Sequence, residues 1–155
     1  MTRVLFVCTG NIFRSLTAER ALRKLLPGLQ IASAGTEDFP HVVRPNVRDY
    51  LREKGFDVSA HRRRTLTREI LEDADLVIAM STDHAEFIER TFGVKTVLFL
   101  EACGLEAAAL PDIEEVVTDY RTNAAAVDAH VRMTIDRIIE LSPRLAGRLD
   151  TLIRR

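Results

Sequence analysis

Four short apolar runs, separated by segments with helical periodicity, constrain the fold of this chain more than any other feature. The runs predict strands over residues 3–7, 29–33, 74–80 and 95–100. The intervening periodicity predicts helices over residues 15–26, 45–54, 67–73 and 83–92. Strands that alternate with helices in this way form a parallel sheet covered on both faces. We therefore predict a single-domain, three-layer α/β fold over residues 1–155, with a central four-stranded parallel sheet and helices on both faces.

The last third of the chain is less regular. Residues 101–119 show no clear period, whereas residues 122–141 carry an apolar stripe that predicts one long helix. Ser142 and Pro143 follow, and proline inside a helix removes a hydrogen bond and clashes with the preceding turn. We expect the helix to be interrupted there and a short amphipathic tail to follow.

The composition excludes several classes of protein. Apolar residues make up 46% and charged residues 29% of the 155 residues, and the formal net charge is −1, so we expect no nucleic-acid partner. We also expect no membrane span and no secretory signal, because no long apolar run occurs. The two cysteines, Cys8 and Cys103, form neither a disulfide framework nor a zinc pattern. We expect a cytoplasmic protein with no metal and no cofactor.

The first predicted strand runs directly into the sequence CTGNIFRS, residues 8–15. Ligands of parallel sheets bind at the carboxyl ends of the strands, where Cys8 lies. Backbone N–H groups of a loop that opens a helix form a cradle for an anion. We expect Gly10 to supply a backbone conformation forbidden to larger residues, and the fork of Arg14 to hold two phosphate oxygens. The predicted phosphate-binding residues are Thr9, Gly10, Asn11, Ile12, Phe13, Arg14 and Ser15.

The same cradle acts on the sulfur of Cys8. N–H donors, a helix N-terminus and a nearby arginine favour a thiolate over a thiol. Cys8 is therefore the predicted nucleophile, and Ser15 is expected to donate a hydrogen bond to its sulfur and ease its departure. The nucleotide-binding pattern Gly-x-x-x-x-Gly-Lys-Ser/Thr is absent, which argues against a nucleoside triphosphatase.

At residues 4–19, VLFVCTGNIFRSLTAE, the chain resembles the low-molecular-weight protein tyrosine phosphatase family, which carries its Cys-x5-Arg-Ser loop at the N-terminus. The likeness continues through residues 33–36, 59–64 and 75–81 and weakens between about 101 and 121. It implies hydrolysis of protein phosphotyrosine through a cysteinyl-phosphate, without a cofactor. It also implies that Asn11 holds the strained shape of the loop and that Ser33 and His61 brace it and orient Ser15.

Two departures from the family pattern concern the chemistry. Many members carry a second cysteine in the loop where this chain has Phe13, so a protective disulfide within the loop is impossible. The family's general acid lies in an Asp-Pro pair before the last helix, and this chain has no such pair.

Two aspartates are candidates for the missing acid. Asp112 has about the family's distance from the fourth strand, and Asp119 has about the family's distance to the last helix. We favour Asp119, because the acid loop should lie just before that helix, and we expect its neighbour Tyr120 to line the substrate pocket.

Three functions follow from these residues. The leading hypothesis is a phosphatase acting on protein phosphotyrosine, with bacterial tyrosine kinases among its expected partners through the resemblance. A catalytically impaired phosphotyrosine or anion binder is the alternative, which the missing Asp-Pro motivates. Arsenate reduction is a third hypothesis, for which only Cys103 is available as a further cysteine. Neither the oligomeric state nor the physiological substrate follows from the sequence.

Overall fold

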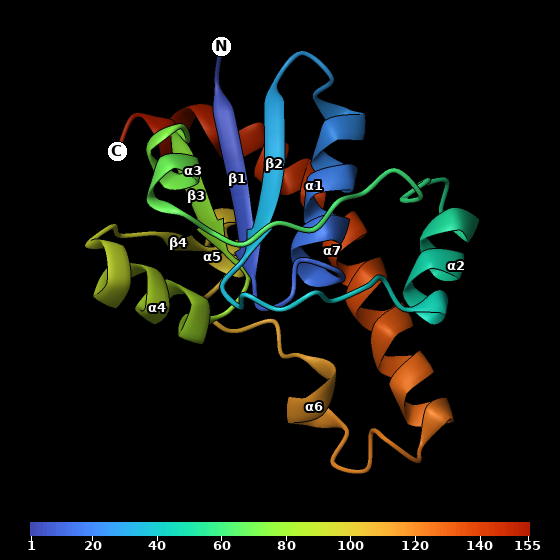
Figure 1. Ribbon diagram of the computed structural model, residues 1–155. Coiled ribbons are helices and arrows are strands. Elements are labelled where there is room, and N and C mark those ends of the chain that lie inside the picture. The colour runs from blue at the N-terminus through green and yellow to red at the C-terminus, as the bar shows by residue number, and fades with distance from the viewer.

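The computed structural model describes residues Met1–Arg155 and contains one four-stranded sheet with the strand order β2-β1-β3-β4. All neighbouring strands are parallel, so the predicted fold class is confirmed. The strands are β1 (Arg3–Cys8), β2 (Gln30–Gly35), β3 (Leu76–Ala79) and β4 (Val97–Leu98). β1, β2 and β3 run downward in Figure 1, and β2 and β4 form the two edges of the sheet.

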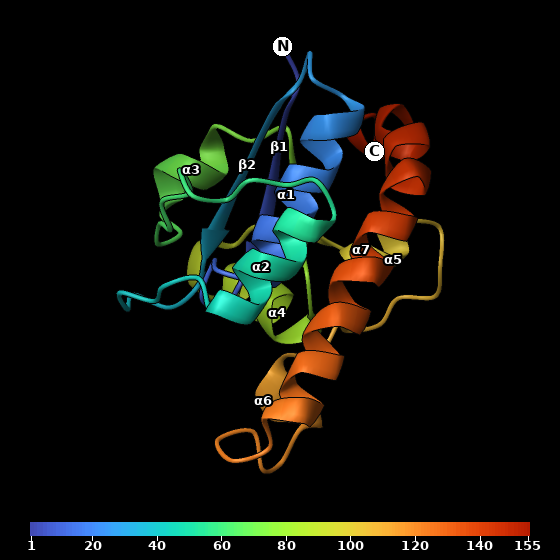
Figure 2. The ribbon, with the colours of Figure 1, turned by 90° about the vertical axis from the view of Figure 1, so that its right-hand side faces the viewer.

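Helices cover both faces of the sheet, and two further helices pack outside them (Figures 1 and 2). One face carries α1 (Arg14–Leu25), α5 (Phe99–Ala102) and α7 (Ala124–Ile153), and the other carries α3 (Arg68–Glu72) and α4 (Thr82–Phe92). The two remaining helices, α2 (Pro45–Glu53) and α6 (Ile113–Val116), pack against α7. None of the helices combines the length and apolar character that a membrane span requires.

The central strand β1 is apolar from Val4 to Cys8 because both of its faces are buried there. Val4 and Phe6 belong to the larger core cluster with α1, α5 and α7, whereas Leu5 and Val7 belong to the smaller cluster under α3 and α4. Cys8, at the end of the strand, is only 2% exposed.

Two sequence-based expectations about the elements are wrong. The fourth strand has only two residues, because the chain turns into α5 at Phe99. The long helix is not interrupted at Pro143 but continues to Ile153. Leu145, Leu149 and Leu152 pack into the larger core beyond the proline, and this burial outweighs the roughly 3 kcal/mol that an internal proline costs.

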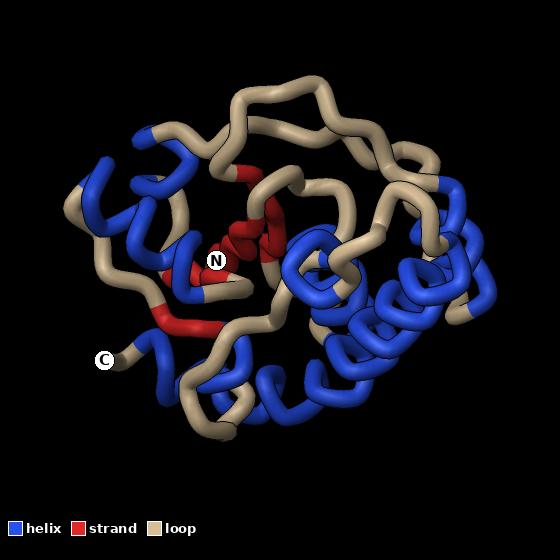
Figure 3. Tube along the Cα trace, turned by 90° about the horizontal axis from the view of Figure 1, so that it is seen from below, coloured by secondary structure: helices blue, strands red, loops and turns tan.

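The carboxyl edge of the sheet is where the candidate site lies. Figure 3 views the molecule from that side and shows the loops that gather around the strand ends. Residues 9–13 join β1 to α1 there, residues 36–44 follow β2, and residues 103–112 lead from α5 to α6. The arrangement brings segments about 100 residues apart in the sequence to one place.

Candidate active site

The turn between β1 and α1 depends on Asn11, which is fully buried and has a φ of +59°. It is the only non-glycine residue with a positive φ, and such left-handed backbone suits asparagine better than most residues. Its side-chain oxygen accepts a hydrogen bond from the backbone N–H of Arg64 at 3.1 Å. Its amide nitrogen donates to Ser15 Oγ at 2.9 Å and Ser33 Oγ at 2.7 Å.

This bonding pattern directs the Ser15 proton. Ser15 Oγ accepts from Asn11, and it lies 2.9 Å from the sulfur of Cys8. Because its lone pairs face the amide, its hydroxyl proton is free to point at Cys8 Sγ. A donor in that place stabilises a thiolate.

The other predicted supporting residue, His61, also reaches the loop. Its Nε2 lies 2.7 Å from the backbone oxygen of Asn11. Burial lowers the pKa of His61, although the bond to Asn11 opposes that shift. The structure thus brings Asn11, Ser15, Ser33 and His61 together around one turn.

The sequence interpretation missed two further supports of this turn. Ser33 Oγ donates to the buried carboxylate of Glu19 at 3.1 Å, so Glu19 fixes the direction of the Ser33 proton. Arg63 Nε donates to the backbone oxygen of Gly10 at 3.1 Å. Charged side chains are common on the surfaces of helices and loops. The sequence therefore gave no sign that Glu19 or Arg63 supports the turn.

The expectation for Gly10 is wrong, because its φ is not positive. A Cβ at Gly10 would instead meet the side chains of His41 and Ile12 at 3.3 Å. The closer approach occurs at Gly35, where a Cβ would lie 2.6 Å from the backbone oxygen of Thr9. Gly35 therefore lets the end of β2 approach the loop.

Arg14 is only 2% exposed, and its guanidinium makes contacts with several protein groups. One terminal nitrogen donates to Leu110 O at 2.8 Å and Ser81 Oγ at 3.1 Å. The other lies 3.3 Å from a carboxylate oxygen of Asp112. These contacts fix the fork of Arg14 beside Cys8, in a cavity of about 170 Å³ that both residues line.

The two candidate acids lie in different places. Asp112 caps α6 and lines the cavity with Cys8 and Arg14. Asp119 lies outside the cavity lining and accepts a hydrogen bond from Asn123 at 3.1 Å. Tyr120 is also absent from the lining, and its hydroxyl accepts from Arg121. The sequence favoured Asp119 as the acid and Tyr120 as a pocket residue, but neither residue lines the cavity. We therefore favour Asp112 as the candidate acid.

His84 is a further residue of the site that the sequence interpretation missed. Its Nε2 lies 2.8 Å from Thr9 Oγ1, and Thr9 Oγ1 also lies 3.4 Å from Arg14. Burial, followed by the positive charge of Arg14, lowers the pKa of His84 to about 4. His84 is thus neutral at pH 7 and supports the loop from α4. The sequence did place His84 shortly after a buried strand, near the carboxyl edge of the sheet, and this position could have marked it as a site residue.

The comparison with protein families agrees with this geometry. Residues 3–112 match the model of the family described as low molecular weight phosphotyrosine protein phosphatase. The chain belongs to this family. The tyrosine phosphatase Etp of Escherichia coli K12 is 40% identical over 82 residues, 52% of this chain, and the match spans about half of the relative's length, 55%.

Solved structures of relatives superpose on nearly the whole chain. The YwlE arginine phosphatase of Geobacillus stearothermophilus superposes with a TM-score of 0.80 at 29% identity, over 97% of this chain and 94% of the other. The tyrosine phosphatase Wzb of Escherichia coli K30, solved with sulphate, has a TM-score of 0.76 at 30% identity, over 95% and 97%.

Replacing Asn11 separates two features of the loop between β1 and α1, its hydrogen bonds and its backbone conformation. We expect both Asn11→Gly and Asn11→Ala to lower the free energy of unfolding by about 2 kcal/mol or more, because buried Ser15 and Ser33 lose a donor. Asn11→Ala should cost about 1 kcal/mol more, because alanine resists a φ of +59°. Urea unfolding measures both, with half-buried Asn46→Ala as the mild control. A glycine variant as stable as the parent would contradict this account.

The low pKa of His84 predicts a specific loss of stability in acid. The unfolded chain protonates His84 near pH 6.5, but the folded chain resists protonation to about pH 4. The free energy of unfolding should therefore fall as the pH drops from 6.5 to 4, by up to about 3 kcal/mol. The neighbouring charges are Arg14, Asp83 and Asp112.

Urea unfolding at several pH values should show a smaller acid loss for His84→Gln than for the parent chain. The control His41→Gln changes a histidine that pairs with exposed Glu37 and should retain the full loss. Equal slopes for the parent and His84→Gln would refute the role of His84.

Proposed function

We propose that the chain is a phosphatase that hydrolyses phosphotyrosine in proteins through a cysteinyl-phosphate on Cys8. The observation that carries the proposal is the meeting of Cys8, Arg14 and Asp112 around one cavity. Each residue supplies one requirement of the reaction, namely a nucleophile, an anion clamp and a proton donor. Residues 1–155 act as one domain in this proposal.

In the first step the Cys8 thiolate attacks phosphorus while the bond to the tyrosine oxygen breaks. Asp112 gives its proton to the departing phenolate. Arg14 and the backbone of residues 9–15 hold the phosphate oxygens as their charge redistributes. The products of this step are tyrosine and the phosphorylated cysteine.

In the second step the Asp112 carboxylate takes a proton from water, and the resulting oxygen attacks phosphorus. The sulfur–phosphorus bond breaks and inorganic phosphate forms. The hydroxyl of Ser15, 2.9 Å from the sulfur, stabilises the departing thiolate. Both steps need no metal, and no group of three His, Cys, Asp or Glu side chains gathers into a metal site.

The walls of the cavity support an aryl phosphate. Ile12, Phe13, Val47 and Ile113 contribute apolar surface that suits the ring of a tyrosine. Protein phosphoarginine is a second candidate substrate, because Glu37 and Glu114 also line the cavity and offer carboxylates for a guanidinium. The similarity to an arginine phosphatase favours testing both.

Arsenate reduction has less support. It recruits further cysteines, and Cys103 is fully buried in the core. Burial raises the pKa of Cys103 to about 11, which keeps it protonated and poorly reactive. The cytoplasm is the proposed location, since a free nucleophilic thiol needs a reducing compartment. Bacterial tyrosine kinases are the proposed partners through the family resemblance.

Turnover of matched peptides tests the proposed function. We expect kcat/KM to be higher for a phosphotyrosine peptide than for the corresponding phosphoarginine peptide. Cys8→Ser should abolish turnover of both while inorganic phosphate still binds. Preference for phosphoarginine would replace the substrate assignment, and phosphate binding without any turnover by the parent chain would identify a binder.

A pair of asparagine variants tests the acid. Asp112→Asn keeps a residue that caps α6 well, but it should lower kcat on a phosphotyrosine peptide by about 10²–10⁴-fold. Asp119→Asn should change kcat little. The defect of Asp112→Asn should shrink on 2,4-dinitrophenyl phosphate, whose leaving group needs no proton. The assignment fails if both variants lose similar activity or if the defect is the same on both substrates.

A further inference from the structure

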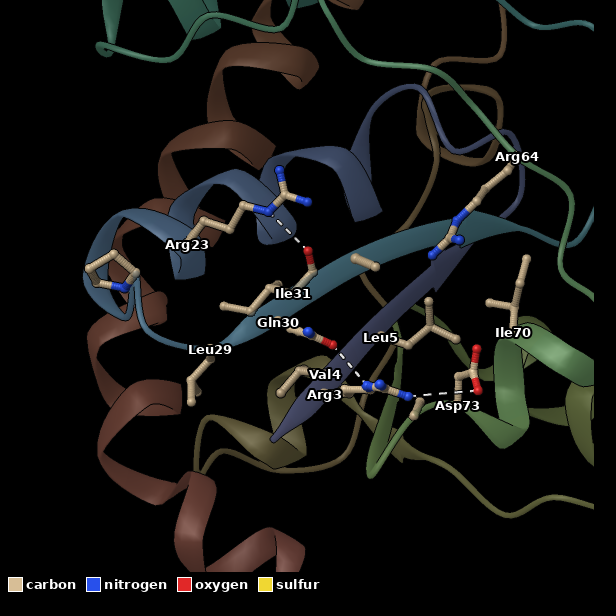
Figure 4. A pocket seen from close by; sticks show the side chains of 13 residues that line it. Arg3, Val4, Leu5, Arg23, Leu29, Gln30, Ile31, Arg64, Ile70 and Asp73 are labelled. Carbon is tan, nitrogen blue, oxygen red and sulfur yellow. Dashed lines mark hydrogen bonds and ion pairs between the residues drawn. The ribbon is translucent and has the colours of Figure 1, made fainter. Parts of the chain in front are cut away.

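A second and larger hollow lies away from the phosphate cavity, along the free edge of β2 (Figure 4). Its volume is about 700 Å³, which is within the usual range of small-molecule sites. The two hollows share no lining residue.

The hollow exists because this part of the sheet is incompletely covered. The helix above it, α3, has only five residues. Ala32 of β2 is small and remains half-buried, and Leu5, Ile70 and Ala74 complete an apolar floor. The floor offers apolar surface for a ligand to cover.

The edge of β2 is closed to another strand. Arg23 Nε donates to Ile31 O at 2.9 Å, and Arg64 Nε donates to Ser33 O at 3.1 Å. Figure 4 shows these two arginines approaching the strand from its opposite ends. An added strand would have to break both bonds, whereas a small ligand leaves them in place.

The polar groups of the hollow are mainly cationic, with three arginines against the single carboxylate of Asp73. Arg3 lies 3.7 Å from Asp73, and Arg23 lies 3.7 Å from Glu19. Arg64 has no carboxylate within 4 Å, and neither of its terminal nitrogens has a hydrogen-bond partner in the chain. Its Nε bond to Ser33 O anchors the fork beside the apolar floor.

We propose that this hollow binds a small organic anion with an apolar body and a carboxylate group. The apolar body covers Ala32 and Ile70, and the carboxylate takes the two free terminal nitrogens of Arg64 in a bidentate pair. Binding requires neither Cys8 nor turnover, so it is independent of the proposed function.

Titration of the full chain with naphthalene-2-carboxylate, followed by ¹⁵N amide shifts, tests the proposal. We expect saturable shifts at Ala32, Ile70 and Ala74 rather than at residues 8–14. Acetate, which has the charge without the apolar body, should bind at least about tenfold more weakly.

Matched variants locate the charge. Arg64→Gln should weaken binding about tenfold or more, the worth of a lost charge-assisted hydrogen bond. Arg62→Gln should leave binding unchanged, because Arg62 is exposed and does not line the hollow. Ala32→Phe, which fills the hollow, should abolish binding and serves if Arg64→Gln is poorly folded.

The proposal is overturned if the shifts map to residues 8–14 and not to Ala32, Ile70 and Ala74. It is likewise overturned if Arg64→Gln binds as well as the parent, or if acetate binds as tightly as the aromatic acid. It is also overturned if Ala32→Phe folds and still binds, or if an extended acidic peptide displaces the naphthoate from this edge.

Discussion

The arrangement of the site depends on the hydrogen bonds that hold Asn11 in left-handed backbone. Such a conformation is unfavourable for a residue with a side chain, by about 1 kcal/mol or more. Here it is held from β2 by Ser33, from α1 by Ser15 and from the segment before α3 by Arg64. Because three separate elements meet at this one side chain, the loop can form its shape only when the domain is folded.

The parts of the site that the sequence predicted are those that are contiguous in the chain. Cys8, Arg14 and Ser15 follow one strand, so their meeting needs only a strand, a turn and a helix. The choice between Asp112 and Asp119 was different, because it depends on the path of residues 101–119, which show no clear period. Capping of α6 by Asp112 holds that residue at the cavity, and Asp119 follows beyond the helix.

Dependence on distant residues also explains why the sequence did not predict the role of His84 or the helix that continues past Pro143. Only tertiary packing buries His84 against Thr9, and only the core around Leu145 allows the helix to pass the proline. Short patterns report local preference, whereas these two outcomes depend on residues far apart in the sequence. The alternation of strands and helices, by contrast, is repeated along the chain and predicted the sheet well.

Strand β2 joins the site to the rest of the molecule. Its last residues, Ser33 and Gly35, support the phosphate loop, while the edge before them borders the second hollow. Arg64 belongs to both regions, since its backbone N–H bonds Asn11 and its side chain bonds Ser33 O. An anion drawn to Arg64 therefore acts on a residue that the loop already uses. Any change that it makes in phosphate affinity must be matched by an equal effect of phosphate on its own affinity.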